Sequence, residues 1–272
     1  MARPGWNPTR RNRHQGTAAR GHGQDNRLTI PDSWLDTRMY WERLRLAVVV
    51  RRDLDGQPLT VLVEPPAPGF VHACTVDDVV AVWALIPADE RRGLELVALR
   101  QPTRKERTLA ASWGRLGYAS ELAPGGGPAI FLHAVRARGV VLRWPRSMTP
   151  ADTQEFERLR SDGFAATESR RWIELVGGVD VVRATLLYRT LLHEVGHYVD
   201  WCTSVLAHVG TAEEDERWRA YDGKPGHDKE AFAHAYATRL AAALRAGGHL
   251  PVPRRRDEPG LIADGLDPAW FA

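Results

Sequence analysis

The chain has 272 residues, of which 43% are hydrophobic and 26% are charged, an ordinary composition for a globular protein. No stretch approaches 18 consecutive apolar residues, so the sequence predicts no membrane-spanning helix. The two cysteines, Cys74 and Cys202, show no C-x-x-C spacing, which excludes a disulfide framework and predicts two reduced thiols.

Positive charge is concentrated at the N-terminal end. Residues 1–30 hold six arginines and one aspartate, whereas the whole chain has a net charge of +3. This segment is poor in large apolar residues, which predicts a disordered basic leader. It lacks the apolar region of a secretory signal, so we expect a cytoplasmic protein. A leader that contacts nucleic acid or an acidic partner is the alternative, but repeated aromatic residues that would stack on bases are absent, so no nucleic-acid partner is expected.

The next part, residues 40–176, is predicted to be rich in strands. The β-branched runs at 43–50 and 59–64 predict a hairpin, because Asp55-Gly56 between them is a strong turn signal. Thr75 and Asp78 have the spacing of a capping box, which predicts a helix through about Leu85. Further expected elements are strands at 94–100, 108–122 and 129–135, a glycine-rich loop at 124–128, a capped amphipathic helix at 149–160, and a short strand or helix lead-in at 171–176.

Residues 177–250 are predicted to be helical. A long helix from about Asp180 to Val205 is apolar on most sides, so it should lie inside the protein. The polar stretch 210–228 contains glycine and proline and is predicted to be a loop. A second helix is expected at 228–246, followed by a surface segment at 251–260. The sequence therefore predicts an α+β fold in which residues 31–272 form a single domain, with a twisted mixed sheet and two helices.

The first of these helices contains the sequence "HEVGH". Residues four apart share one face of a helix, so His193 and His197 present two imidazoles side by side, a spacing that binds one zinc ion. Glu194 lies one step round the helix, where it can reach a water at the metal without being a ligand. Three unpartnered polar side chains in an apolar helix would each cost roughly 1–3 kcal/mol. A hydrogen-bonded core cluster is the alternative, but the pattern favours one Zn²⁺ per chain.

A catalytic zinc site needs a third protein ligand and an open position. Glu230 lies near the start of the second helix, 33 residues after His197, and we expect its carboxylate to be this ligand. His227, Asp228 and the acidic run at 213–216 are the competing candidates.

Two segments, "HEVGHYVD" and "EAFAHAYA", resemble the catalytic domain of the anthrax-toxin lethal-factor family of gluzincin metalloproteases. The resemblance covers about 20 residues and concerns the metal site alone. It implies a zincin-like fold, with an active-site helix and a second ligand-bearing helix. It also implies zinc ligands at His193, His197 and Glu230, with Glu194 as the general base.

The resemblance further implies a tyrosine before the third ligand that stabilises the transition state. Tyr221 is the candidate, although its distance of nine residues from Glu230 is looser than in the family. One turn after the third ligand the family has an acid that orients an imidazole, whereas this chain has His234. Asp200, three residues after His197, is expected to supply that hydrogen bond instead.

These features predict a zinc-dependent metalloprotease that acts on a protein or peptide substrate. Tyr221 or His227 would stabilise the oxyanion, and the substrate would extend along an edge strand, either "AIFLHA" or "SWGRLGYAS". A catalytically silent zinc-containing regulatory or binding module is the first alternative, and a protease-type toxin or effector is the second. Glu194 favours catalysis, because a structural zinc site has no use for it.

Overall fold

The computed structural model describes residues 38–109, 112–122 and 125–272. The predicted basic leader, residues 1–30, lies outside the described residues. Residues Tyr40–Ala272 form one compact unit of mixed helices and strands, so the predicted α+β class is confirmed. Within the described part of the chain, no helix has the length and apolar character needed to cross a membrane.

The chain first forms an antiparallel hairpin from β1 (Val48–Leu54) and β2 (Gln57–Val63). Asp55 and Gly56 connect the strands with φ angles of 55° and 78°. Both values lie in the left-handed region that a tight two-residue hairpin turn requires. The predicted hairpin is confirmed, although its first strand begins later than the apolar run suggested.

Three further strands complete a five-stranded mixed sheet in the order β1-β2-β4-β6-β5. β4 (Leu96–Arg100) and β6 (Gly125–His133) run parallel to β2, and β5 (Gly114–Leu122) pairs antiparallel with β6 at the sheet edge. The predicted loop at 124–128 is wrong for 125–128, because these residues belong to β6, which pairs with the end of β5. The start of the strand predicted at 108–122 is also wrong, since α3 (Arg104–Leu109) occupies it.

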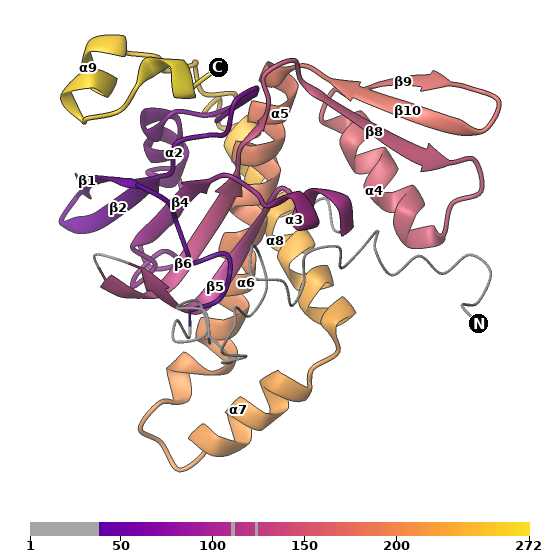
Figure 1. The fold of residues 1–272 in the computed structure, drawn as a ribbon. Coiled ribbons are helices and arrows are strands. Elements are labelled where there is room, and N and C mark those ends of the chain that lie inside the picture. Colours follow the sequence, from indigo (N-terminus) through magenta and orange to yellow (C-terminus); the bar gives the residue numbers. More distant parts are fainter. Residues whose placement is uncertain (1–37, 110–111, 123–124) are drawn as a thin grey trace, which may run out of the picture. The chain divides into compact units, whose positions relative to one another are not determined.

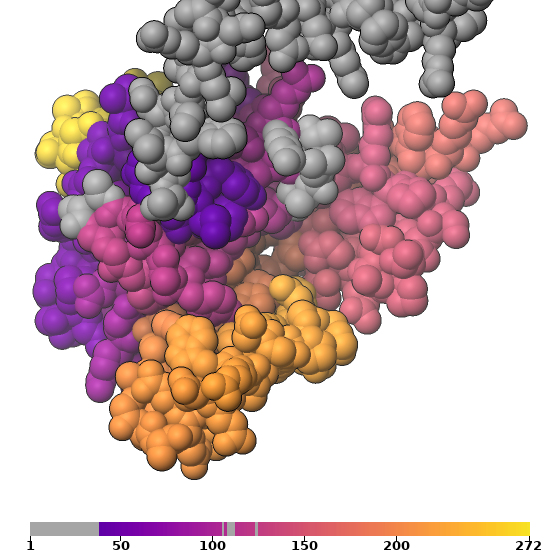
Figure 2. Space-filling model, turned by 60° about the horizontal axis from the view of Figure 1, so that its bottom comes forward, coloured from indigo at the N-terminus to yellow at the C-terminus, as the bar shows by residue number. Residues whose placement is uncertain are grey.

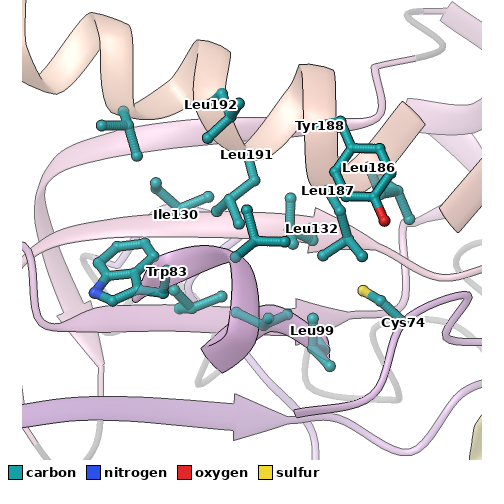
Figure 3. Packing of buried hydrophobic residues seen from close by; sticks show 14 of the residues in the cluster. Cys74, Trp83, Leu99, Ile130, Leu132, Leu186, Leu187, Tyr188, Leu191 and Leu192 are labelled. Carbon is teal, nitrogen blue, oxygen red and sulfur yellow. The ribbon is translucent and has the colours of Figure 1, made fainter. Parts of the chain in front are cut away.

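The predicted helix at 180–205 is present but is interrupted. It consists of α5 (Val179–Thr185), a π-helical turn η2 (Leu186–Thr190) and α6 (Leu191–Ser204). Its apolar side packs on the sheet together with α2 (Val76–Trp83), whose capping box between Thr75 and Asp78 is present as predicted. Figure 3 shows leucines of η2 and α6 packed on residues of strand β6, and this contact sets the distance between the helix and the sheet. The helix residues are Leu186, Leu187, Leu191 and Leu192, and the strand residues are Ile130 and Leu132.

On the other face of the sheet, Trp41, Leu44 and Ala47 from the segment before β1, together with Val49 of β1, pack on a smaller cluster that includes Leu62 and Phe131. A second, three-stranded sheet in the order β8-β10-β9 packs with α4 (Figure 1). The helix predicted at 149–160 is α4, and the segment 171–176 is strand β10, whereas β8 and β9 were not predicted. The remaining bounds are β3 (Phe70–Val71), β7 (Val135–Arg136), β8 (Val140–Pro145), α4 (Pro150–Ser161), β9 (Ala165–Glu168) and β10 (Trp172–Gly177).

The C-terminal part contains more helix than predicted. The predicted loop at 210–228 is wrong, because α7 (Glu214–Gly223) lies within it. The second predicted helix is α8 (Gly226–Ala246), which lies beside α6 (Figure 1). The predicted surface segment at 251–260 is largely exposed but has a buried Val252, and its end begins α9. The other bounds are η3 (Leu206–His208), α9 (Glu258–Ala263) and η4 (Pro268–Trp270).

Candidate metal centre

A cavity of about 520 Å³ opens where α6 and α8 meet β5 and α4. In Figure 2 the surface is hollowed where the magenta, pink and orange segments come together. The π-helical turn ends at Thr190, with two residues between it and the "HEVGH" segment, and such turns occur often at functional sites. The residues that line the cavity include His193, Glu194, His197, Glu230 and His234.

Three of these side chains direct their donor atoms at a common point. The Nε2 atoms of His193 and His197 are 3.1 Å apart. The carboxylate of Glu230 lies 3.2 Å from Nε2 of His193 and 3.5 Å from Nε2 of His197. Hydrogen bonds from His193 and His197 hold the pKa of Glu230 well below its usual range. The structure therefore brings together the three residues that the sequence predicted as ligands.

These separations match those of ligands around one tetrahedral zinc ion. Two ligands at the usual zinc distance of about 2.0–2.1 Å lie about 3.3 Å apart in tetrahedral geometry. The donor set of two imidazoles and one carboxylate is also one that zinc prefers. The residues present thus fit a metal ion with three protein ligands.

His234 is a further nitrogen donor at the same place. A ligand atom of His234 lies within 4.8 Å of those of His193 and Glu230, so these three residues could also hold a metal ion. Its ring centre is 4.3 Å from that of His193, and burial lowers its pKa to about 4. His197 lies 3.1 Å from His193 and 3.5 Å from Glu230, close to the tetrahedral spacing. His197 and His234 are thus the two candidates to complete a site with His193 and Glu230.

The hydrogen bonds behind the two imidazoles differ from those predicted. Both oxygens of Asp200 accept from Lys224 Nζ, at 3.0 and 2.7 Å. The Nδ1 atoms of His193 and His197 are buried and have no partner among the described residues. The prediction that Asp200 orients His197 is therefore wrong, because the lysine ammonium takes that carboxylate.

Glycine at position 196 allows α8 to approach the imidazoles. A Cβ atom there would lie 3.0 Å from Cα of Ala233 and 3.1 Å from Cβ of Tyr236. Glu230 sits three residues before Ala233, less than one helical turn away. The close packing of the two helices therefore places the Glu230 carboxylate against the two histidines.

Replacing Gly196 by alanine is expected to weaken both folding and metal binding. The added methyl group must push α8 away, which typically costs about 1–3 kcal/mol of stability in a packed core, and the shift carries Glu230 away from the imidazoles. Gly223→Ala is the matched control, because a Cβ at that position meets nothing within 4 Å. Melting temperature and zinc affinity would be measured together, and a Gly196→Ala chain with wild-type values of both would contradict this account.

Glu194 lies beside the three donor atoms but is not one of them. Its side chain lines the cavity and the residue is only 7% exposed. Burial raises the pKa of its carboxyl group, while the nearby imidazoles and a hydrogen bond from the Leu116 backbone N–H oppose that shift. A buried carboxylate of this kind is a stronger base than one in water.

The tyrosine that lines the cavity is Tyr118, which the sequence analysis did not single out. Its hydroxyl is 3.0 Å from that of Tyr221, and burial raises the pKa of both phenols. Tyr221 is not among the residues that line the cavity, and the ammonium of Lys229 covers its ring at 4.5 Å. Tyr221 therefore lies behind Tyr118 as seen from the cavity, with the two hydroxyl groups in contact.

No protein-family model, curated protein or solved structure matches this chain. The resemblance to the lethal-factor family thus rests on the two quoted segments and stays a prediction.

The other candidate ligands lie away from the centre. The side chain of His227 is 82% exposed and contacts Asp228 at 3.2 Å. Neither residue lines the cavity. Glu213, from the acidic run at 213–216, pairs with Arg217 at 2.9 Å. The structure therefore favours Glu230 over these competitors.

The open edge of β5 borders the same cavity. Of the two predicted edge segments, "SWGRLGYAS" contributes the edge strand and "AIFLHA" lies inside the sheet. The carbonyl of Trp113 accepts from the N–H of His133 at 3.0 Å, so alternation along the strand directs the backbone groups of Gly114 and Leu116 away from β6.

Proposed function

We propose that the chain is a zinc-dependent peptidase with a zincin-like fold. The observation that carries this proposal is the arrangement of His193, His197 and Glu230, whose donor atoms lie 3.1–3.5 Å apart. Beside them lies a buried carboxylate, Glu194, that is not a member of the set. Three protein ligands with a separate base are typical of catalytic zinc sites, whereas structural sites usually close with four ligands.

A zinc ion bound there would act as a Lewis acid that polarises the substrate carbonyl and acidifies the attacking water. The chain's own groups carry the protons. Glu194 accepts the proton of the water and passes it to the amine that leaves. Its burial between the packed elements limits the orientations that its side chain can take.

In this proposal Tyr118 donates a hydrogen bond from its hydroxyl to the oxygen that becomes negative. Its ring lines the cavity and its hydroxyl is held by Tyr221. An extended peptide is the substrate that suits this site, because the open edge of β5 offers backbone groups of Gly114 and Leu116 for pairing. The substrate thus lies between β5 and the metal centre.

Tyr118→Phe is expected to lower kcat by about 10²-fold while zinc content stays unchanged. Loss of one donor to the oxyanion typically has an effect of this size. Tyr221→Phe should have a smaller effect, because its hydroxyl acts only through Tyr118. Steady-state kinetics on a cleaved peptide would separate the two, and a larger loss in Tyr221→Phe would reverse the assignment.

Zinc analysis of the purified chain, joined to a peptide-library cleavage assay, tests the function. We expect one zinc per chain, cleavage of at least one library peptide, loss of cleavage on chelation and its return with added zinc. A chain that holds zinc but cleaves nothing in a broad library would favour the binding-module alternative. A chain that binds no zinc would contradict both the peptidase proposal and the binding-module alternative.

A further inference from the structure

A second cavity, of about 200 Å³, lies at the junction of the two sheets. We call it the Phe70 cavity. It shares Ser112 and Trp113 with the metal-centre cavity, but no histidine or carboxylate of the metal centre lines it. Most of its wall is apolar, formed by Phe70, Trp113, Val135, Val140 and Leu142.

The two titratable groups deepest in the Phe70 cavity contribute no uncompensated charge. Glu106 accepts two hydrogen bonds from Arg100, at 2.7 and 3.2 Å, and one from the Thr103 N–H at 2.8 Å. Burial opposes ionisation of Glu106, but these bonds lower its pKa to about 2. Its charge is thus neutralised by Arg100. Burial also lowers the pKa of His133 to about 4, so that imidazole is neutral near pH 7.

Two exposed arginines, Arg107 and Arg136, also line the Phe70 cavity. The guanidinium carbons of Arg107 and Arg136 lie 4.6 and 5.4 Å from the centre of the Phe70 ring. Arg107 donates to the Pro102 carbonyl, at 3.3 Å. Within the described part of the chain neither guanidinium has an ion pair with a carboxylate. The lining of this apolar cavity therefore includes two guanidiniums that have no carboxylate partner in the described part of the chain.

We propose that the Phe70 cavity binds a small aromatic carboxylate, with its ring among Phe70, Trp113 and Leu142 and its carboxylate on Arg107 and Arg136. The charge of the site selects an anion, since both guanidiniums approach the same Phe70 ring and a carboxylate accepts charge-assisted hydrogen bonds from guanidinium groups. The apolar wall selects a hydrophobic body. The proposal stands independently of the peptidase function, because no metal-centre ligand takes part.

The size of the Phe70 cavity limits this ligand to about one ring and a short chain. A dry apolar cavity of about 150 Å³ accommodates benzene, so 200 Å³ leaves room for a phenyl ring and two methylene groups. A carboxylate at the end of that chain would then reach the guanidiniums in the lining. A nucleotide or a longer fatty acid exceeds the space.

The probe is 3-phenylpropionate, compared with its neutral counterpart 3-phenylpropanamide, and binding to the full chain is followed by calorimetry and ligand-observed NMR. We expect the acid to bind at least about tenfold more tightly than the amide, since hydrogen bonds to charged groups are roughly twice as strong as neutral ones. In Arg107→Gln/Arg136→Gln this preference should disappear. Arg138→Gln, in the same turn but outside the cavity lining, should keep it.

Binding is measured with zinc present and after chelation, because a carboxylate can also bind a metal. Preference for the acid that persists without zinc and requires the arginine pair supports the proposal. Three results would overturn it: no binding of either compound up to about 10 mM, a concentration that detects even weak sites; equal binding of acid and amide; or acid binding that depends on zinc and not on the arginines. Thermal melts of the exposed arginine variants establish that they remain folded.

Discussion

His193→Ala is expected to abolish stoichiometric zinc binding. The Nε2 atom of His193 is 3.1 Å from that of His197 and 3.2 Å from the Glu230 carboxylate, so its loss leaves two of three protein ligands. His197→Ala should behave alike. The exposed His227 provides the matched control, and His227→Ala should retain one zinc per chain by elemental analysis.

Glu230 allows a graded form of the same test. Glu230→Ala should lose zinc, whereas Glu230→Asp, whose carboxylate is one methylene shorter, should bind it more weakly than wild type. A hydrogen-bond partner behind a metal-bound histidine typically contributes 10–100-fold in metal affinity, and the Nδ1 atoms of His193 and His197 have no such partner among the described residues. We therefore expect a modest zinc affinity, which must be measured at a buffered concentration of free zinc. Full zinc content in His193→Ala, or retention by Glu230→Ala through His234, would refute this ligand set.

The sequence was sufficient where a local pattern has one structural solution. Asp55-Gly56 specified a hairpin, and Thr75 with Asp78 specified a helix start, because each pattern satisfies its own backbone groups. The spacing of His193 and His197 similarly fixed which side chains share a helix face. These predictions needed no information about distant parts of the chain.

Prediction from the sequence failed where tertiary contacts decide the secondary structure of a segment. Residues 125–128 join β6 because β5 lies beside them, not because glycine favours a strand. The helix α7 is polar on most sides and is supported by ion pairs such as Arg217–Glu213 and by one buried side chain, Tyr221.

Tertiary contacts also decide which residues of distant segments reach the candidate site. Tyr118 lies 76 residues before Glu194 and belongs to no recognisable motif, so only the packing of β5 against α6 reveals its place beside the metal centre.

Glu194→Gln is expected to retain zinc and to cleave peptide at least about a hundredfold more slowly than wild type. General acid–base catalysis typically contributes 10²–10⁴ in rate, and glutamine removes the basic group while keeping the side-chain size. Its carbonyl oxygen can still accept the hydrogen bond from Leu116. Because burial raises the pKa of Glu194, the neutral side chain should fold at least as stably as the wild type.

Three measurements on this variant separate an enzyme from a zinc-containing scaffold: zinc content, melting temperature and kcat on a peptide that the wild type cleaves. Glu174→Gln is the control, since Glu174 pairs with Arg143 on the second sheet and lies outside the cavity lining. It should leave all three values unchanged. If Glu194→Gln loses zinc, the carboxylate is a ligand and the base lies elsewhere. If it cleaves as fast as the wild type, Glu194 is not the base.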